Sequence, residues 1–500
     1  MRLYDTLRRE TADFAPAEPG HVRMYNCGPT VYRRDRRGND RAYMTADLLR
    51  RAFEYLGWKV TQVMNITDVG HLTEDDVADA QGEDKLQAEA ARRKVDPWRI
   101  AREVEEWFHT DRRALGILDA HRYPRATEHI PEMIEMIRDL EEKGQAYAVA
   151  GNVYFAVDSF PRYGALSGNT TEKLEAGASG RVEDRGDKRS PHDFALWKHD
   201  PKHLMQWDSP WGKGFPGWHI ECSAMSRKYL GDTFDVHTGG PDNIFPHHEC
   251  EIAQSESVTG KTFVRHWVHC GWLTIDGSKM AKRAGKLYTV PELLEMGYSG
   301  ADIRMFLLRQ HYRKPLPFDL EVLDDAKRQR ARINNFVHHE MAERPEDFEK
   351  DEVKAAVEEA RTRFRAALED DLNTSEAFAV IHDFMTAVNK AGPSRADAAA
   401  VVAFMRECDR VLAILDDPED DALDAEVERL IEERAAARKA RDFARGDAIR
   451  DELLARGIEL IDTPQGTRWR RRSSRCLARK STLCRGARRP RAEYRRSMRY

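Results

Sequence analysis

A strand, a glycine turn, a helix and a second strand follow one another near the start of the chain. Residues 22–27 are strand-like and 28–30, Gly-Pro-Thr, interrupt them. Residues 43–56 carry apolar side chains at helical spacing, and 57–59 turn into a second strand over 60–66. Parallel strands joined by a helix form a βαβ unit, from which doubly wound sheets are built. The opening therefore predicts a Rossmann-like α/β domain.

The patterning changes along the chain, and with 500 residues two to four domains are expected. Helical periodicity is found over 85–93, 98–115 and 130–143, and strand-and-turn patterning is predicted over 217–287. From about 320 to 458 almost every segment is predicted to be helical. We expect two halves of the sheet domain at 1–120 and 206–265, an inserted connective segment at 121–205, a connecting region at 266–320, an all-α C-terminal domain at 321–471 and a basic tail at 472–500.

Composition excludes several classes of protein. No apolar run approaches the roughly 18 residues of a membrane span, and the first residues lack a signal-peptide pattern. We therefore expect a soluble, cytoplasmic protein without a membrane partner. Seven scattered cysteines argue for metal ligation or free thiols rather than a disulfide framework. Residues 470–500 contain 12 Arg, and without them the chain is clearly acidic, which argues against indiscriminate nucleic-acid binding.

The segment 245–251, Phe-Pro-His-His-Glu-Cys-Glu, is a candidate ligand pair. Proline favours a helix start, and His247 and Glu251 would then share one face at i, i+4 spacing. Histidine and cysteine with one carboxylate form an acceptable zinc set, and Cys27 and Cys222 are two of the seven cysteines. By spacing alone, a surface pair is the commoner explanation for the histidine and the glutamate, and a small buried hydrophobe is the commoner explanation for each cysteine.

Two glycine-containing segments suit a nucleotide. Residues 277–286 place four positive side chains, among them Lys279 and Lys282, within eight residues, with glycines at 277 and 285. A basic loop can follow the charge of a leaving pyrophosphate, although a solvated basic turn fits equally well. Gly239 and Gly240 follow a strand-like segment and would allow close backbone approach to a ligand; a plain tight turn is the alternative.

Seven ordered stretches carry a family resemblance. They are LYDT at 3–6, YNCGPTVY at 25–32, NITD at 65–68, GWHIECSAM at 217–225, HTGGPDNIFPHHE at 237–249, KMAK at 279–282 and DTPQGTRW at 462–469. In this order they resemble the cysteinyl-tRNA synthetases, which are class I aminoacyl-tRNA synthetases, from near residue 3 to about 471. The resemblance implies ATP-dependent activation of L-cysteine to cysteinyl-adenylate, followed by transfer to the terminal ribose of tRNA-Cys.

The resemblance also implies the site residues. One zinc ion per chain would be held by Cys27, Cys222, His247 and Glu251. Zinc takes a thiolate readily and a hydroxyl poorly, so cysteine is separated from serine without an editing domain. Mg-ATP is the expected co-substrate. The other implied roles are Thr67 and Trp218 as pocket walls, Asp242 for the substrate ammonium, Gly38, Asn39, Gly239, Gly240 and Lys282 for ATP, and Lys279 with Lys282 as the catalytic lysines.

The helical C-terminal third would read the tRNA, and a monomer is expected. Residues 432–454 form one predicted amphipathic helix. Its basic side chains, close in the chain to Trp469 and Arg470, could contact phosphates and unstacked bases, whereas a solvated face with Glu–Arg pairs explains any single arginine better. The side chains concerned are Arg434, Arg438, Lys439, Arg441, Arg445 and Arg450.

The nucleotide signature departs from the family pattern. The family has His-Ile-Gly-Asn where this chain has Arg36-Arg37-Gly38-Asn39, and the loop after Lys279 has Ala281 and Arg283 in place of serines. Arginine binds phosphate but differs in shape and charge. One alternative is therefore a catalytically impaired relative that binds zinc and RNA. Another is a ligase that joins cysteine to a small amine, as in the mycothiol pathway, although such enzymes resemble only the catalytic half.

Overall fold

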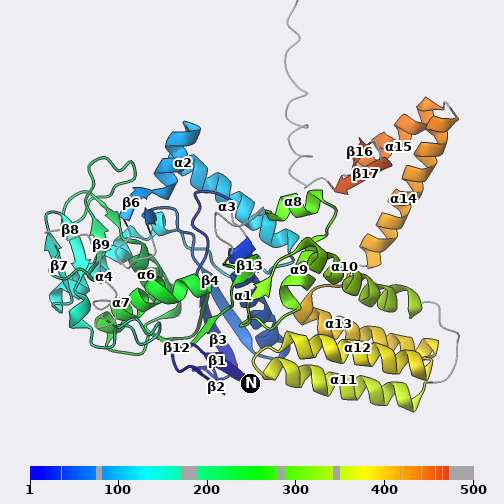
Figure 1. The fold of residues 1–500 in the computed structure, drawn as a ribbon, viewed down its shortest axis with the longest axis horizontal. Coiled ribbons are helices and arrows are strands. Elements are labelled where there is room, and N and C mark those ends of the chain that lie inside the picture. The colour runs from blue at the N-terminus through cyan, green and yellow to red at the C-terminus, as the bar shows by residue number, and fades with distance from the viewer. Residues whose placement is uncertain are drawn as a thin grey trace, which may run out of the picture. The chain divides into compact units, whose positions relative to one another are not determined.

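The chain forms two compact units, Met1–Leu415 and Asp416–Tyr500. The computed structural model in Figure 1 describes residues 1–34, 37–74, 81–170, 188–275, 278–279, 288–341, 349–416, 418–440, 442–456, 458–463 and 466–471. Among these residues no helix is long and apolar enough to cross a membrane.

The first unit is built on a parallel four-stranded sheet with the order β12-β11-β3-β4. Its strands are β3 (His21–Asn26), β4 (Lys59–Met64), β11 (Phe234–Gly239) and β12 (Val264–His269). The chain leaves β3 through helix α1 (Arg37–Tyr55) toward β4, and it leaves β11 in the opposite direction toward β12. The topological switch point therefore lies between the carboxyl ends of β3 and β11, where open α/β sheets bind ligands.

This arrangement confirms the predicted βαβ opening and the Rossmann-like fold class. Strands β3 and β4 match the predicted strands to within two residues, while α1 begins six residues earlier than predicted. Every residue of β11 is buried, as expected for a central parallel strand. The predicted helices are present as α2 (Lys85–Arg93), α3 (Pro97–Ala114) and α4 (Ile130–Glu142).

An antiparallel sheet with the order β10-β9-β8-β7 is inserted into the sheet domain. Its strands are β7 (Ala146–Val149), β8 (Asn152–Phe155), β9 (Phe194–Lys198) and β10 (Phe215–Pro216). The chain then enters helix α6 (Trp218–Leu230), and helix α7 (Glu249–Thr259) follows β11.

The prediction of strands and turns across 217–287 is therefore wrong at α6 and along most of α7, although a helix start was correctly expected close to Pro246. Both helices are buried on nearly all sides, and many of their buried side chains are polar. An apolar stripe of helical period is then absent from the sequence, and periodicity cannot reveal the helix. The buried polar side chains include His219, Glu221, Ser223, Ser226, Glu249, Glu251, Gln254 and Ser255.

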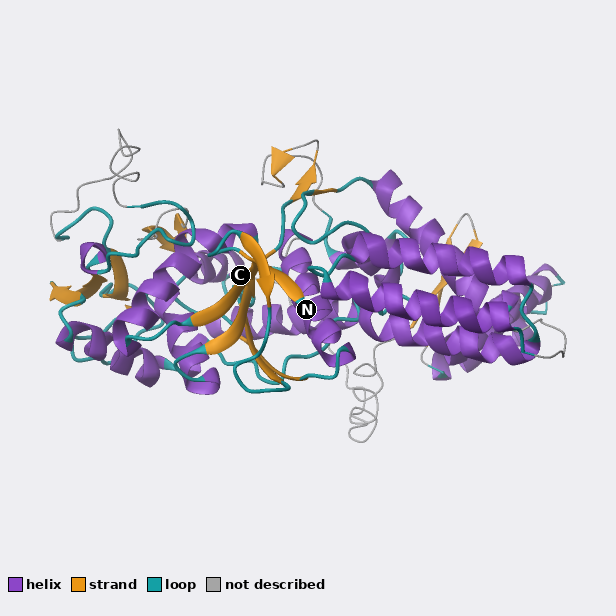
Figure 2. Cartoon of the chain, turned by 90° about the horizontal axis from the view of Figure 1, so that it is seen from below, coloured by secondary structure: helices purple, strands orange, loops and turns teal. Residues whose placement is uncertain are grey.

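Long helices follow the sheet domain and pack side by side (Figures 1 and 2). They are α9 (Gly300–Leu308), α10 (Leu320–Asn335), α11 (Asp351–Glu369), α12 (Thr374–Ala391) and α13 (Arg395–Leu412). Helix α13 starts with a capping box in which Ser394 and Asp397 satisfy each other's backbone N–H groups, and it packs against α1. The remaining short elements of this unit are β1 (Arg2–Asp5), β2 (Glu10–Asp13), β5 (Leu72–Glu74), β6 (Gln81–Asp84), β13 (Leu273–Ile275), β14 (Ser278–Lys279), α8 (Val290–Glu295) and β15 (Leu316–Pro317).

The described residues of the second unit form two helices and a hairpin. They are α14 (Pro418–Lys439), α15 (Phe443–Ala455), β16 (Ile458–Thr463) and β17 (Gly466–Arg471). The single helix predicted over 432–454 is wrong, because Asp442 accepts a hydrogen bond from the backbone N–H of Arg445 and starts α15 anew. Arg441 and the predicted tail at 472–500 lie outside the described residues.

Candidate metal centre

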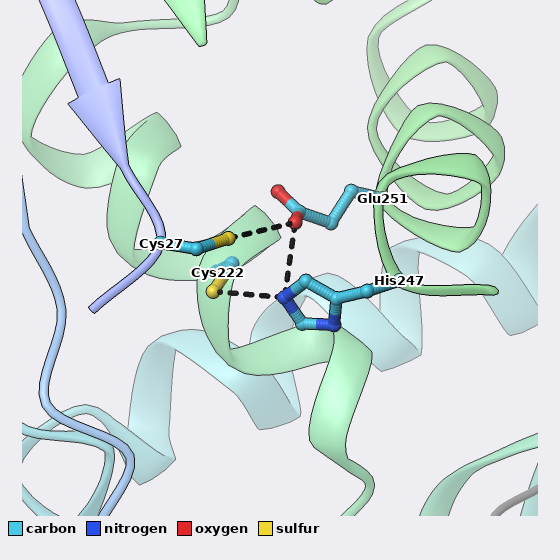
Figure 3. Close-up of side chains that lie close together, drawn as sticks. All are labelled: Cys27, Cys222, His247 and Glu251. Carbon is cyan, nitrogen blue, oxygen red and sulfur yellow. Dashed lines mark hydrogen bonds and ion pairs between the residues drawn. The ribbon is translucent and has the colours of Figure 1, made fainter. Parts of the chain in front are cut away.

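Four side chains from distant parts of the sequence converge beside the switch point (Figure 3). Cys27 directly follows β3, Cys222 lies on α6, His247 lies in the wide turn Ile244–His248, and Glu251 lies on α7. Their ligand atoms all lie within 4.8 Å of one another. Cys222, His247 and Glu251 are buried, and Cys27 is partly exposed.

The separations between these atoms suit ligands of one ion. His247 Nε2 lies 3.4 Å from Cys222 Sγ and 3.1 Å from Glu251 Oε1, and Cys27 Sγ lies 3.9 Å from the same Glu251 oxygen. Ligand bonds of roughly 2.0–2.3 Å in a tetrahedron give edges of about 3.3–3.8 Å. The predicted shared face of His247 and Glu251 is confirmed, although α7 begins at Glu249 rather than before His247.

Two further histidines form a second possible ligand group with Cys27 and Glu251. His248 Nε2 lies 3.2 Å from Cys27 Sγ, and His237 Nε2 lies 3.0 Å from Glu251 Oε2. Neither His248 nor His237 belongs to the ligand set that the family resemblance implies. Both stand in the HTGGPDNIFPHHE stretch, so that stretch holds two more imidazoles than the ligand set uses.

Burial works against charge on the four candidate ligands and on His248. It raises the pKa of Cys222 well above that of a free thiol, and it raises the pKa of Cys27 and of Glu251. It lowers the pKa of His247 and His248 well below the usual histidine range. Neutral imidazoles are ready to ligate, and a divalent cation would stabilise the thiolates and the carboxylate. Two sulfurs, one nitrogen and one oxygen form a donor set that fits zinc.

An aromatic wall stands beside the cluster. The Trp218 ring stacks on His247 with ring centres 4.3 Å apart and on His71 at 4.1 Å. His71 is held by Thr30 Oγ1 at 2.6 Å. On the adjoining side, Thr67 Oγ1 donates to Glu221 Oε2 at 2.9 Å, and Glu221 directly precedes Cys222 in the chain. The structure therefore brings Trp218 against the candidate ligand His247, and Thr67 against the residue that precedes the candidate ligand Cys222.

Three of the residues expected to bind ATP, Gly38, Asn39 and Gly240, lie in or beside the first turns of α1. Gly38 and Asn39 lie in its first turn. A Cβ on Gly240 would come within 3.9 Å of the Ala42 side chain, which places the turn after β11 beside this helix. Gly239 packs against His248, where a Cβ would lie 2.7 Å from the ring.

Three other predicted site residues are less completely described. Asp242 is exposed in the short helical turn Pro241–Asn243 that follows β11. Lys279 belongs to β14, where only the backbone is described. Lys282 lies outside the described residues, as does Arg36 of the altered signature.

Gly28 fixes the position of Cys27 through close backbone packing. A Cβ at this residue would lie 1.7 Å from the carbonyl oxygen of Asn65, whose side chain also accepts the Gly28 N–H at 2.8 Å. We expect Gly28→Ala to displace Cys27 and to reduce the amount of bound metal. It should also lower the free energy of unfolding by about 1–3 kcal/mol or more. Metal analysis together with urea unfolding checks this, and an alanine variant with full metal content would contradict it.

Asp68 makes stability depend on pH. Burial raises the pKa of its carboxyl to about 6, although Thr127 donates to it through its backbone N–H and its hydroxyl. A carboxyl with a raised folded-state pKa contributes stability at low pH that is lost as pH rises, here between about 4 and 6.

We expect Asp68→Asn, which resembles the protonated form, to gain stability over the wild type by on the order of 3 kcal/mol between pH 4 and 7. Urea unfolding at several pH values measures the difference between the two proteins. A difference that stays constant with pH would contradict the expectation.

Family models match nearly the whole chain. They are tRNA synthetases class I (C) catalytic domain at residues 13–328, DALR domain at 363–416 and Cysteinyl-tRNA ligase anticodon binding domain at 420–470. Two relatives named cysteine–tRNA ligase are similar over 94% of this chain. The one from Symbiobacterium thermophilum is 47% identical with 99% of its length covered, and one from Thermus thermophilus is 44% identical with 98% covered.

Solved structures agree in fold. The chain is similar to a Mycobacterium tuberculosis methionyl-tRNA synthetase in complex with methionyl-adenylate, with a TM-score of 0.54, 15% identity, and 79% of this chain and 90% of that chain covered. It is also similar to the LeuRS of a ternary complex from Agrobacterium radiobacter K84, with a TM-score of 0.55, 11% identity, and 81% and 84% covered. At such identities only the fold is shared. The relatives and the family models together show that this chain belongs to the cysteine–tRNA ligases, a family of class I aminoacyl-tRNA synthetases.

Proposed function

We propose that the protein activates L-cysteine with ATP and transfers it to the terminal ribose of tRNA-Cys, with cysteine selected at a zinc ion. The observation that carries the proposal is the buried group Cys27, Cys222, His247 and Glu251 beside the switch point of the sheet. A zinc ion held there would take the substrate sulfur as a thiolate and leave the serine hydroxyl poorly bound.

The other predicted residues would position the two substrates. Trp218 and Thr67 wall the amino-acid pocket, and the Asp242 carboxylate receives the ammonium. Residues 38–39 and 239–240 let ATP approach the backbone. The cysteine carboxylate then attacks the α-phosphate and pyrophosphate leaves. Lys279 and Lys282 stabilise the leaving charge, so that activation rests on positioning and electrostatics.

The C-terminal part would recognise the tRNA. The proposed division assigns 321–471 to tRNA and the basic tail 472–500 to non-specific RNA affinity, and a monomer is expected. Helix α15 carries Arg445, which lies 2.6 Å from Glu433 in an exposed ion pair. Such a pair contributes little to stability. Arg445 can therefore exchange Glu433 for a tRNA phosphate.

The central test is ATP–pyrophosphate exchange, run with cysteine and with serine side by side on the zinc-loaded protein. Exchange with cysteine alone, together with charging of tRNA-Cys, is expected. Absence of both activities with zinc bound would overturn the proposal. Equal exchange with serine would overturn selection at the metal.

The altered signature supports one alternative, an impaired relative that binds zinc and RNA. Arg36-Arg37 stands where the family has His-Ile. Arg36→His separates the two cases. A large gain in exchange would identify Arg36 as the lesion in an otherwise intact site, whereas unchanged, already high exchange would show that arginine serves the triphosphate.

A further inference from the structure

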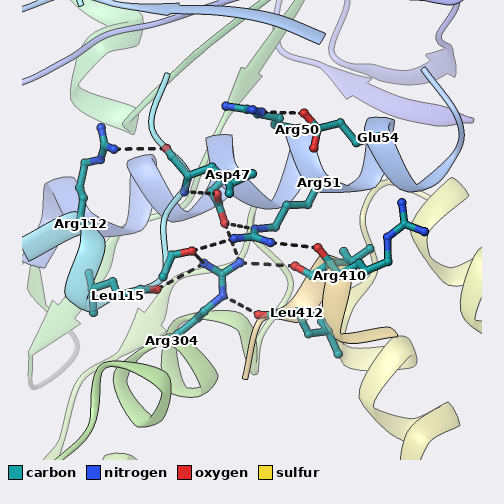
Figure 4. Close-up of polar contacts among 12 residues, drawn as sticks. Asp47, Arg50, Arg51, Glu54, Arg112, Leu115, Arg304, Arg410 and Leu412 are labelled. Atoms are coloured by element: carbon teal, nitrogen blue, oxygen red, sulfur yellow. Dashed lines mark hydrogen bonds and ion pairs between the residues drawn. The ribbon is translucent and has the colours of Figure 1, made fainter. Parts of the chain in front are cut away.

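A buried polar cluster joins the sheet domain to the helical bundle at the middle of α1. We call it the α1–α13 joint, and Figure 4 shows its members. It contains Asp47 and Arg51 of α1, Arg304 of α9, and the backbone carbonyls at the end of α13. None of its members belongs to the metal centre or to the proposed ATP residues.

Arg304 is the centre of the joint. Its side chain is fully buried, and its guanidinium forms an ion pair with Asp47 at 2.6 Å. The remaining N–H groups point to carbonyl oxygens of two other segments, which a planar fork of donors can reach together. These acceptors are Leu412 and Val411 at the end of α13, and Leu115 and Gly116 after α3.

Asp47 holds two arginines at once. It pairs with Arg51 at 2.8 Å as well as with Arg304, and it accepts the backbone N–H of Leu118 at 2.9 Å. Burial disfavours its charge, but the two arginines outweigh burial and lower its pKa. Arg51 in turn donates to the carbonyl of Arg410 at 3.0 Å. Two cations therefore bind the carbonyl end of α13, where the helix dipole favours positive charge.

Helix α1 also contacts the segment before β13, the strand that pairs with the Lys279 strand β14. Arg41, in the second turn of α1, donates to the carbonyls of Gly271 at 3.0 Å and Trp272 at 2.7 Å, directly before β13. Helix α1 thus carries Gly38 and Asn39 in its first turn, contacts the segment before β13 through Arg41, and is bound to the end of α13 through Arg51. Helix α13 is in turn the last helix of the first unit, after which the chain continues into residues 416–471.

We infer that Arg304 and Asp47 are positioning residues for the transfer step, which hold α13 and α1 in one register so that bound tRNA meets the activated cysteine. The inference rests on the proposed function. Activation uses only ATP and cysteine, and none of the residues proposed to bind them belongs to the joint, so activation does not need the joint. Transfer needs a tRNA held partly by the helical region, and a misplacement of about 1 Å can cost about 100-fold in rate.

Arg304→Lys tests the inference, because lysine keeps the charge beside Asp47 but lacks the fork that reaches the carbonyls of α13. We expect exchange with cysteine to stay within about twofold of wild type, and kcat/KM for tRNA charging to fall about 10- to 100-fold. Arg51 is more exposed than Arg304, so the Arg51→Lys protein is expected to fold. It should show a smaller loss of tRNA charging, again with little change in exchange.

Arg112→Lys is the matched control. Arg112 is equally buried, but its hydrogen bonds go to Leu118, Asp119 and Tyr123, all within the sheet domain. Its replacement should lower thermal stability without separating the two activities. If Arg304→Lys lowers exchange and charging by the same factor, or changes neither, the joint is only structural and the inference is overturned.

Hydrogen–deuterium exchange gives a readout that does not depend on catalysis. Added tRNA should slow amide exchange over residues 37–55 in the wild type and much less in Arg304→Lys. Equal slowing in both proteins would overturn the inference. A wild type that neither activates nor charges cysteine would overturn the proposed function, and this amide experiment would still decide whether the joint transmits tRNA binding.

Discussion

Replacing Cys222 with serine is expected to remove the bound metal and to lower cysteine-dependent ATP–pyrophosphate exchange at least about 100-fold. Loss of an outer partner of a metal ligand already costs about 10- to 100-fold, and a direct ligand should cost more. Cys222 is fully buried, and its sulfur lies 3.4 Å from His247 Nε2. The serine hydroxyl would not ionise there to replace a thiolate. Elemental analysis and the exchange assay measure the two effects.

Cys250→Ser provides the matched control for this prediction. Cys250 is also fully buried and directly precedes Glu251, but its sulfur lies 3.5 Å from the Tyr163 hydroxyl and belongs to neither possible ligand group. This variant should keep the metal and most of the exchange activity. A Cys222→Ser protein that retains stoichiometric metal would contradict the prediction and would show that the ion uses the second group, which contains His237 and His248.

Replacing Asp47 with asparagine is expected to lower the free energy of unfolding by about 3–5 kcal/mol. Removing one partner of a buried ion pair leaves an uncompensated charge inside the protein, and here two arginines, Arg304 and Arg51, lose their shared carboxylate. Asparagine keeps an oxygen for the Leu118 N–H but adds an N–H group that faces guanidinium donors. Urea unfolding followed by tryptophan fluorescence measures the change.

Glu54→Gln is the control for the Asp47 variant on the same helix. Glu54 forms an i, i+4 pair with Arg50 at 2.8 Å, and its side chain is 37% exposed. An exposed pair of this kind contributes about 0–1 kcal/mol. Similar losses for the two variants would contradict the central role of Asp47 in the joint, because burial would then make no difference to the cost.

Local sequence patterns predicted the elements whose side chains obey a simple period. The strands β3 and β4 and helices α2, α3 and α4 have clear apolar periodicity, and each is present close to its predicted position. The pairing of His247 with Glu251 needed only the helical repeat and is confirmed at 3.1 Å. Helix α6 escaped prediction, and only the start of α7 was predicted, because burial on all sides removes the period that reveals a helix.

The family resemblance in the sequence named all four candidate ligands without any geometry. Spacing alone supported only His247 and Glu251, because Cys27 and Cys222 are far apart in the chain. The parallel order β12-β11-β3-β4 brings the end of β3 beside the end of β11, and α6 and α7 complete the group. Nothing in the local pattern encodes that strand order, since it depends on contacts between distant segments.

By itself, the sequence determined the Rossmann-like opening, the helical C-terminal part, the family and the chemical character of the ligands, because each follows from local periodicity or from ordered motifs. Only the tertiary structure decided that His237 and His248 stand within ligand distance of Cys27 and Glu251. It also decided that Arg304 and Asp47 fasten α1 to α13. The physical reason is the same in both cases: buried polar groups must find partners, and those partners are set by the packing of whole elements rather than by neighbours in the chain.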